Sequence, residues 1–158
     1  MLYLLFQLGN DRYALEAGRV VEVVPMVRIE RLPGAPRGVA GIFNYRGRPV
    51  PAVDLCELAL GRASGARLST RIIVLNCRDA DDREQLMGLI AENATATLRR
   101  DPEDFVDPGL RLPAAPYLGP VLMDQSGAIR RLDETRLLPE PVRDLLFGQI
   151  AQLSHDRG

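Results

Sequence analysis

Short runs of apolar residues, separated by turn-forming residues, dominate the chain and predict a mostly β protein. Each run has the length of a strand, and glycine, proline, asparagine or aspartate stands between most of them. The expected strands cover residues 2–8, 13–15, 20–24, 39–45 and 48–53 in the first half, and residues 71–76, 85–92, 94–98, 117–123 and 128–132 in the second half.

Two segments have a helical pattern instead. Residues 55–60 predict a short helix that Gly61 ends, because glycine readily adopts the left-handed conformation found after a helix. Residues 139–153 predict a longer C-terminal helix with Pro141 in its first turn. One face of this helix is apolar, and it either packs on the rest of the fold or binds a partner. That face carries Val142, Leu145, Leu146, Gln149, Ile150 and Leu153.

The two halves of the chain repeat one short pattern, which predicts two copies of one β unit. We expect a single domain over residues 1–158, with two small β-barrels side by side and a groove between them. Residues 1–62 belong mainly to the first barrel, residues 70–138 mainly to the second, and the polar residues 62–69 link them. The matching positions, 79 or 80 residues apart, are Ala35-Pro36 with Ala115-Pro116, Gly47 with Gly127, and Asp54 with Asp133.

The composition removes the residues that most enzyme chemistry needs. All 20 basic residues are arginines, so the chain has no lysine for a P-loop or a Schiff base. The only histidine, His155, lies close to the chain end, where neither a Ser-His-Asp site nor a zinc site is expected. We therefore expect a protein that is not an enzyme and that holds no cofactor and no metal.

An acidic run at residues 79–84 suggests either a metal site or a solvated turn. Arg78 and Arg83 stand beside and within it, and expected strands flank it on both sides. The pattern therefore favours the solvated turn.

Two features bear on the cellular compartment. Cys56 and Cys77 are too few for a disulfide framework, and we expect buried thiols in a reducing environment. The first apolar run ends by Leu8 without a preceding basic region, which is too short for a signal peptide, and no stretch approaches a membrane span. The expectation is a cytoplasmic protein without direct membrane insertion.

The most specific motif is GVAGIFNYRGRPVPAVDL, residues 38–55, and YALEAGRVVEVVP, residues 13–25, precedes it. Together these segments resemble the CheW-like coupling domain of bacterial chemosensory pathways. The resemblance implies two five-stranded, SH3-like β-barrels and a noncatalytic adaptor. Such an adaptor binds the regulatory domain of a chemosensory histidine kinase and the cytoplasmic tip of a methyl-accepting chemoreceptor, and it can self-associate in receptor arrays. Within the family the segments resemble Wsp-type couplers, which implies a surface-sensing pathway that controls a diguanylate cyclase.

The motif also supplies candidate partner-binding residues. Arg46 comes first, because a guanidinium at a hairpin tip is a good anchor for a partner's carboxylate, although a solvated turn arginine is the alternative. The resemblance adds Val20 and Glu22, whose alternatives are core packing and surface solvation. The complete set is Arg46, Val20, Glu22, Gly41, Arg48 and Tyr45.

Other residues of the motif have structural interpretations. Asn44 is expected to cap the hairpin turn, and Asp54 to cap the helix that follows it. Gly41 permits the close approach of a neighbouring backbone. Pro49 and Pro51 alternate along one strand, so both remove hydrogen-bond donors from the same side and predict an edge strand.

Two other functions compete with the adaptor. The tetrapeptide Tyr45-Arg46-Gly47-Arg48 suggests a small β-barrel that binds nucleic acid. Such modules need a positive track and stacking aromatics, whereas the formal net charge is -1 and the chain has only four Phe and four Tyr. An enzyme that uses only Asp and Glu is the third possibility, and no spacing of these residues supports it.

Overall fold

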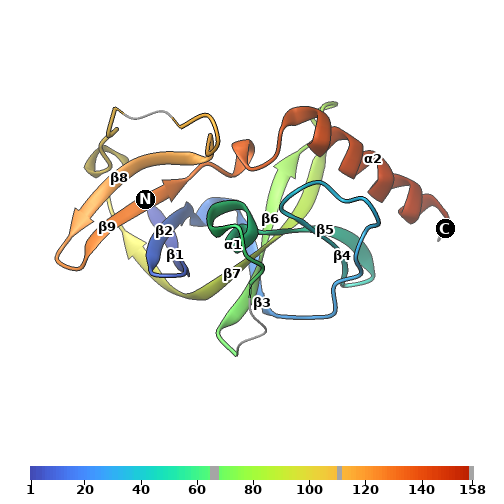
Figure 1. Ribbon diagram of the computed structural model, residues 1–158, viewed down its shortest axis with the longest axis horizontal. Coiled ribbons are helices and arrows are strands. Elements are labelled where there is room, and N and C mark those ends of the chain that lie inside the picture. The colour runs from blue at the N-terminus through green and yellow to red at the C-terminus, as the bar shows by residue number, and fades with distance from the viewer. Residues whose placement is uncertain (65–67, 110–111, 157–158) are drawn as a thin grey trace.

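The computed structural model of the chain describes residues 1–64, 68–109 and 112–156. Part of the expected link at residues 62–69 and the side chain of His155 lie outside the described residues. The described residues form nine strands, two α-helices and three short 3-10 helices, so the expected mostly β fold is confirmed (Figure 1). The strands are β1 (Leu2–Leu8), β2 (Asp11–Glu16), β3 (Val20–Pro25), β4 (Val39–Tyr45), β5 (Arg48–Asp54), β6 (Thr70–Arg78), β7 (Glu84–Arg99), β8 (Leu118–Asp124) and β9 (Gly127–Leu132). The helices are α1 (Leu55–Leu60), α2 (Glu140–Asp156), η1 (Ala17–Arg19), η2 (Pro102–Asp104) and η3 (Glu134–Arg136).

The strands pair into two units of five strands each. The first unit has the order β3-β6-β7-β5-β4, the second has the order β7-β1-β2-β9-β8, and β7 belongs to both. In each unit a residue beyond the first strand reaches across to the last one, through the antiparallel bridges Glu30↔Ile42 and Val106↔Val121. These bridges close each five-stranded sheet on itself, which leaves fewer exposed edges for unwanted strand pairing.

One long strand replaces two expected ones. Residues 85–92 and 94–98 were expected as separate strands, but β7 runs through both. Asn93 has a φ of 51°, so the strand changes direction there without ending. Before this bend β7 pairs with β6 and β5, and from Glu92 onward it pairs with β1. The change of partner joins the two units.

The pairing also differs from the expected division at residues 62–69. β1 and β2 come from the first half of the chain, yet they pair with β7 and β9 in the second unit. The physical reason is the length of β7, whose second part offers β1 an edge from Leu2↔Arg99 to Leu5↔Ala96. The repeat itself is visible in matching hydrogen bonds. Asp54 N donates to Gly38 O at 2.7 Å, and Asp133 N donates to Tyr117 O at 2.8 Å.

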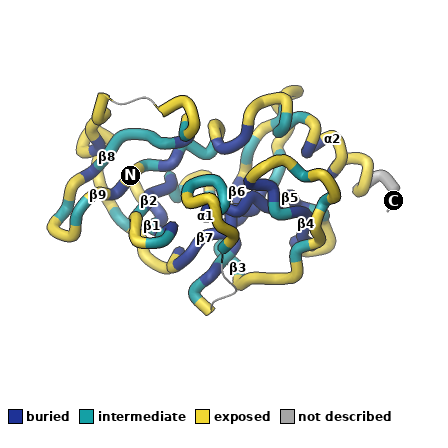
Figure 2. Tube along the Cα trace, in the orientation of Figure 1, coloured by how far each residue is buried: buried dark blue, intermediate teal, exposed yellow. Residues whose placement is uncertain are grey.

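The hydrophobic core has one large cluster between the units and a smaller one within each, and buried residues gather there in Figure 2. Helix α2 packs against β5 at the end of the molecule opposite β8 and β9 (Figure 1). Its residues Leu146 and Ile150 are buried, as expected, and so is Phe147, which the expected face did not include. Leu145 and Leu153 were expected on the same packed face, but they are 62% and 39% exposed, because only the side of α2 that carries Leu146, Phe147 and Ile150 packs on the fold.

Candidate partner-binding site at the first hairpin

The hairpin between β4 and β5 turns tightly at Arg46-Gly47, as the sequence predicted. The two residues have φ values of 51° and 83°, the pair of positive values that a two-residue type I′ turn requires. Asn44 Oδ1 accepts a hydrogen bond from Gly47 N at 2.7 Å, which confirms the expected cap. The turn therefore fixes the direction in which Arg46 leaves the sheet.

Glu22, Tyr45 and Arg46 come together at this tip. Arg46 Nη2 lies 2.9 Å from Glu22 Oε2, and the Arg46 guanidinium stands over the Tyr45 ring at 5.3 Å. Tyr45 donates a hydrogen bond from its hydroxyl to the same Glu22 oxygen at 2.6 Å, and this bond raises the pKa of Tyr45. Three of the six candidate residues thus form one cluster, which links β3 to the hairpin tip.

This cluster suits binding and contains no catalytic arrangement. The Arg46 side chain remains 73% exposed, and an ion pair at such a position is worth roughly 0–1 kcal/mol. A partner's carboxylate can therefore replace or share the Glu22 contact at little cost to the fold. The Arg46 fork offers it several N–H donors in fixed geometry.

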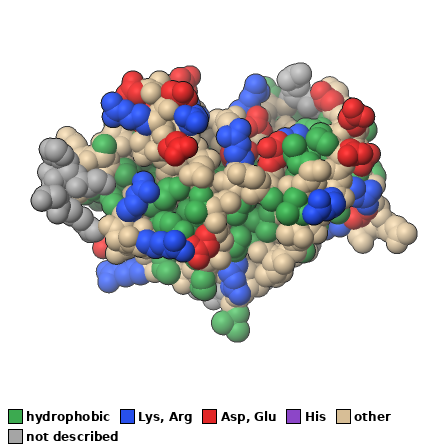
Figure 3. Space-filling view, turned by 180° about the vertical axis from the view of Figure 1, so that it is seen from behind, with side chains coloured by type: hydrophobic (Ala, Val, Ile, Leu, Met, Phe, Trp, Pro, Cys, Tyr) green, Lys and Arg blue, Asp and Glu red, His purple; other side chains and the backbone are tan. Residues whose placement is uncertain are grey.

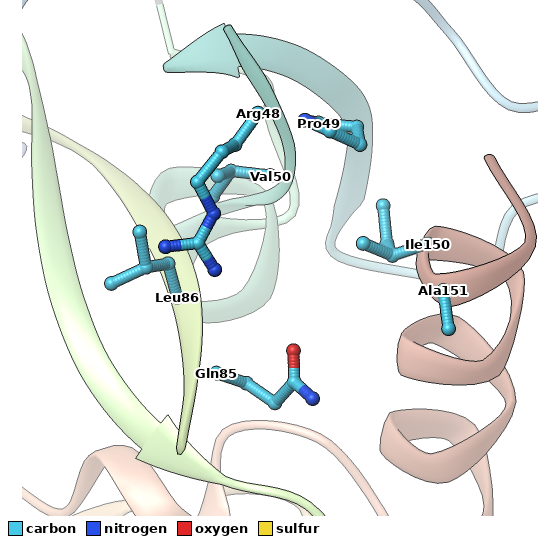
Figure 4. Close-up of a pocket in the computed structure, with 7 residues that line it drawn as sticks. All are labelled: Arg48, Pro49, Val50, Gln85, Leu86, Ile150 and Ala151. Atoms are coloured by element: carbon cyan, nitrogen blue, oxygen red, sulfur yellow. The ribbon is translucent and has the colours of Figure 1, made fainter. Parts of the chain in front are cut away.

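The other three candidates lie elsewhere. Val20 is half-buried and packs against the large core cluster. Gly41 is buried, and a Cβ there would lie 2.0 Å from the carbonyl oxygen of Glu30, so the expected close approach is to the chain's own backbone. Arg48 is exposed and lines a cavity beside α2, and its side chain makes no hydrogen bond or ion pair with any residue that the structure describes (Figure 4).

Some exposed apolar residues close to Glu22 in the sequence were not among the candidates. Val21 in β3 is exposed, and so are Met26 and Val27 just after that strand. The apolar run VVEVVPMV was the available signal, because it is longer than the half-buried strand needs. These side chains extend the surface that a partner can cover.

Two expected structural roles are confirmed. Asp54 caps α1, since its side chain accepts hydrogen bonds from Cys56 N and Glu57 N. In the acidic run, Asp79 accepts hydrogen bonds from Asp81 N and Arg83 N, so the run forms a turn closed by its own backbone. Within the described ranges no group of His, Cys, Asp and Glu side chains is arranged to hold a metal ion, and no helix is long and apolar enough to cross a membrane.

The sequence pattern of the CheW-like domain matches residues 2–141 of the chain. The chain belongs to the CheW-like domain family. A chemotaxis protein CheW of Helicobacter pylori is 30% identical over 104 residues, which are 65% of this chain and 59% of that protein. Protein PilI of Pseudomonas aeruginosa is 34% identical over 74 residues, which are 47% of this chain and 42% of that protein. The chain thus matches less than two thirds of the length of these relatives.

The fold agrees with this membership. The crystal structure of the scaffolding protein TtCheW from Thermoanaerobacter tengcongensis matches with a TM-score of 0.74 and 24% identity, over 87% of each chain. The CheW-like fold with a C-terminal helix is therefore confirmed, and the SH3-like character of each unit stays a prediction. The family match ends at Pro141, so nearly all of α2 lies beyond it.

Proposed function

We propose that this CheW-like domain is a noncatalytic adaptor that couples a methyl-accepting chemoreceptor to a chemosensory histidine kinase. The observation that carries the proposal is the exposed Arg46 at the hairpin tip of a CheW-like domain, held over Tyr45 and paired with Glu22. The partners are the regulatory domain of the kinase and the cytoplasmic tip of the receptor.

In this cluster a partner's carboxylate can take the place of the Glu22 carboxylate on Arg46. Arg46 is positioned by Tyr45 and Glu22, so little side-chain freedom is lost when a partner binds. Arginine is enriched among the residues that dominate binding energy at protein interfaces. The exposed Val21, Met26 and Val27 add apolar area in the same segment as Glu22.

The finer assignment is a Wsp-type coupler in a surface-sensing pathway that controls a diguanylate cyclase. Its support is the resemblance of residues 13–25 to those couplers. The adaptor works in the cytoplasm, is recruited to membrane-associated receptor arrays, and self-associates there.

The nucleic-acid alternative is not favoured. Stacking on bases needs an exposed aromatic ring, whereas Tyr45 is only 8% exposed and its hydroxyl is used by Glu22. On the face shown in Figure 3, arginines lie scattered among acidic and hydrophobic side chains and form no continuous positive track.

Calorimetry tests the proposal with the kinase regulatory domain and the receptor tip encoded nearest to this chain. We expect saturable binding of wild type to at least one of them, and a loss of about tenfold or more for Arg46→Glu, as for a residue central to an interface. The melting temperature should change little, because an exposed pair is worth roughly 0–1 kcal/mol.

A charge swap separates partner contact from internal structure. Glu22→Arg with Arg46→Glu restores an internal ion pair but places the wrong charge toward a partner's carboxylate. We expect the double variant to bind as poorly as Arg46→Glu alone. Recovery of binding would show that the pair acts only within the fold, and absence of wild-type binding to both partners would overturn the proposed function.

A further inference from the structure

A cavity of about 330 Å³ separates α2 from the strands beneath it (Figure 4). Arg48 extends from β5 toward Leu86 and Gln85, and α2 lies on the opposite side. The volume is at the lower end of the ~300–1,000 Å³ range of ligand pockets, which suits one or two side chains and not a whole helix. The lining residues are Arg48, Pro49 and Val50 of β5, Gln85 and Leu86 of β7, and Ile150 and Ala151 of α2.

The cavity lies along a strand edge that another strand cannot join. β5 pairs with β4 from Arg48 onward, but it pairs with β7 only from Ala52 onward. Pro49 and Pro51 have no N–H, so the outer side of this part of β5 lacks the donors that an added strand needs. The expected edge strand is thus found in this part of β5, and only side chains can dock against it.

Helix α2 covers this edge incompletely. On the α2 side the cavity is lined by Ile150, which is 6% exposed, and by the small, exposed Ala151. Val50 and Leu86 line it on the side of the strands. The cavity therefore has apolar walls from three elements.

The charge at the cavity is unbalanced. The Arg48 guanidinium has no hydrogen-bond or ion-pair partner among the described residues, whereas that of Arg46, two positions earlier, is paired with Glu22. A guanidinium beside apolar walls favours a carboxylate, because the two ions form parallel hydrogen bonds in a partly dry site. An occupant that matches both features carries an acidic and an apolar side chain close together.

We propose that this cavity is a second docking point, which takes an acidic and an adjacent apolar side chain from one helical turn of a signalling partner. The inference rests on the proposed adaptor function. It also goes beyond the family, because Ile150 and Ala151 lie outside the residues that match the CheW-like domain. The groove between β5 and α2 thereby sets which partner this chain selects.

Three variants test the docking point by calorimetry with the kinase regulatory domain and the receptor tip. Ala151→Leu and Leu86→Phe add volume to the cavity from α2 and from β7, and Arg48→Ala removes the cation. Two further variants are matched controls. Gln152→Leu adds the same side chain at the next position of α2, which is exposed like Ala151 but does not line the cavity, and Arg99→Ala removes an exposed arginine of β7 in the second unit.

We expect both filling variants and Arg48→Ala to weaken binding to one of the two partners by about tenfold or more. Gln152→Leu and Arg99→Ala should bind like wild type, and added salt should weaken wild type more than Arg48→Ala. Circular dichroism and thermal unfolding show whether a filling variant displaces α2. Because Ala151→Leu and Leu86→Phe lie in different elements, the test still stands if one of them disturbs the fold.

The outcomes separate this inference from the function on which it rests. If wild type binds a partner and the filling variants bind it equally well, the docking point is wrong and the adaptor function stands. Loss in Arg48→Ala alone also overturns the cavity, because it leaves a surface charge contact only. Failure of wild type to bind either partner overturns both.

Discussion

Replacing Gly41 by alanine should destabilise the fold strongly, because the backbone of another segment occupies the place of the new side chain. A Cβ at this position would lie 2.0 Å from the carbonyl oxygen of Glu30 and 2.7 Å from its carbon. The φ of Gly41 is 148°, which residues with a side chain rarely adopt. The contacted group is backbone, so it cannot move aside as the end of a flexible side chain would.

Two contributions set the size of the loss. A residue held in a sparsely populated backbone region costs roughly 1–3 kcal/mol. Relief of the clash must separate Glu30 from Ile42, which exchange two backbone hydrogen bonds of 2.8 Å, and each such bond is worth about 0.5–1.5 kcal/mol. Gly41→Ala should therefore lower the free energy of unfolding by about 2–6 kcal/mol. For a chain of this length the melting temperature should fall on the order of 10 °C.

Two other glycines provide matched controls. Gly47 has a φ of 83°, but no atom lies within 4 Å of the place that a Cβ would take, so Gly47→Ala should cost only the left-handed penalty of about 1–2 kcal/mol. Gly18 has open space and no positive φ, so Gly18→Ala should be nearly neutral. Urea unfolding and calorimetry measure all three. If Gly41→Ala loses no more stability than Gly47→Ala, the close approach is absent and Gly41 becomes a candidate for partner contact again.

Three further results are expected. Arg12 holds the pKa of Asp124 at about 2, below the ~3.9 of an unfolded aspartate, so their pair stabilises fully above about pH 4 and is lost as the pH falls through about 2. Asp124→Asn should make the loss of stability over that range shallower in urea unfolding, and an unchanged slope would contradict this. Burial raises the pKa of Cys77 to about 11 and also raises that of Cys56, so at about pH 8 both thiols should react with a disulfide reagent slowly until the chain unfolds. Asn93 has a φ of 51°, so Asn93→Val should cost about 1–2 kcal/mol more than Asn93→Gly in thermal unfolding, and equal costs would refute the need for a left-handed residue.

Local chemistry made parts of the fold predictable. The turn at Arg46-Gly47 and the cap by Asp54 depend on residues within a few positions of each other, and both were found as expected. The same holds for the end of α1, where Gly61 has a φ of 72°. In each case the hydrogen bonds involved lie inside one short segment, so the sequence contains all the information that decides them.

Features that depend on distant partners were not predictable in this way. Nothing near Asn93 indicates that β7 continues through it, because the continuation depends on β1, which begins 91 positions earlier at Leu2. The pairing of Arg46 with Glu22 likewise depends on the hairpin tip reaching β3, 24 positions earlier in the chain. Both candidates were recognised from the motif, but their contact follows only from the closed sheet.

The second hairpin, between β8 and β9, also carries a charged residue at its tip, but there the charge stabilises the fold. Asp124 is the last residue before the second turn, the place that Tyr45 holds in the first hairpin. Its two oxygens accept hydrogen bonds from Arg12 at 2.9 and 2.6 Å, and one of them also accepts Ser126 N at 2.8 Å. These bonds hold the tip against β2 and lower the pKa of Asp124. The charge of Asp124 is therefore already paired within the chain.

The first hairpin distributes its polar groups differently. A neutral amide, Asn44, caps the turn, and the charge stands on the exposed Arg46 beyond it. Arg46 donates one hydrogen bond to Glu22, whereas Arg12 donates hydrogen bonds from both of its terminal nitrogens to the two oxygens of Asp124. Bidentate pairs are the stronger ones, so a partner's carboxylate competes far more easily at the first tip than at the second. The difference between the two hairpins therefore supports the first, and not the second, as the proposed partner-binding site.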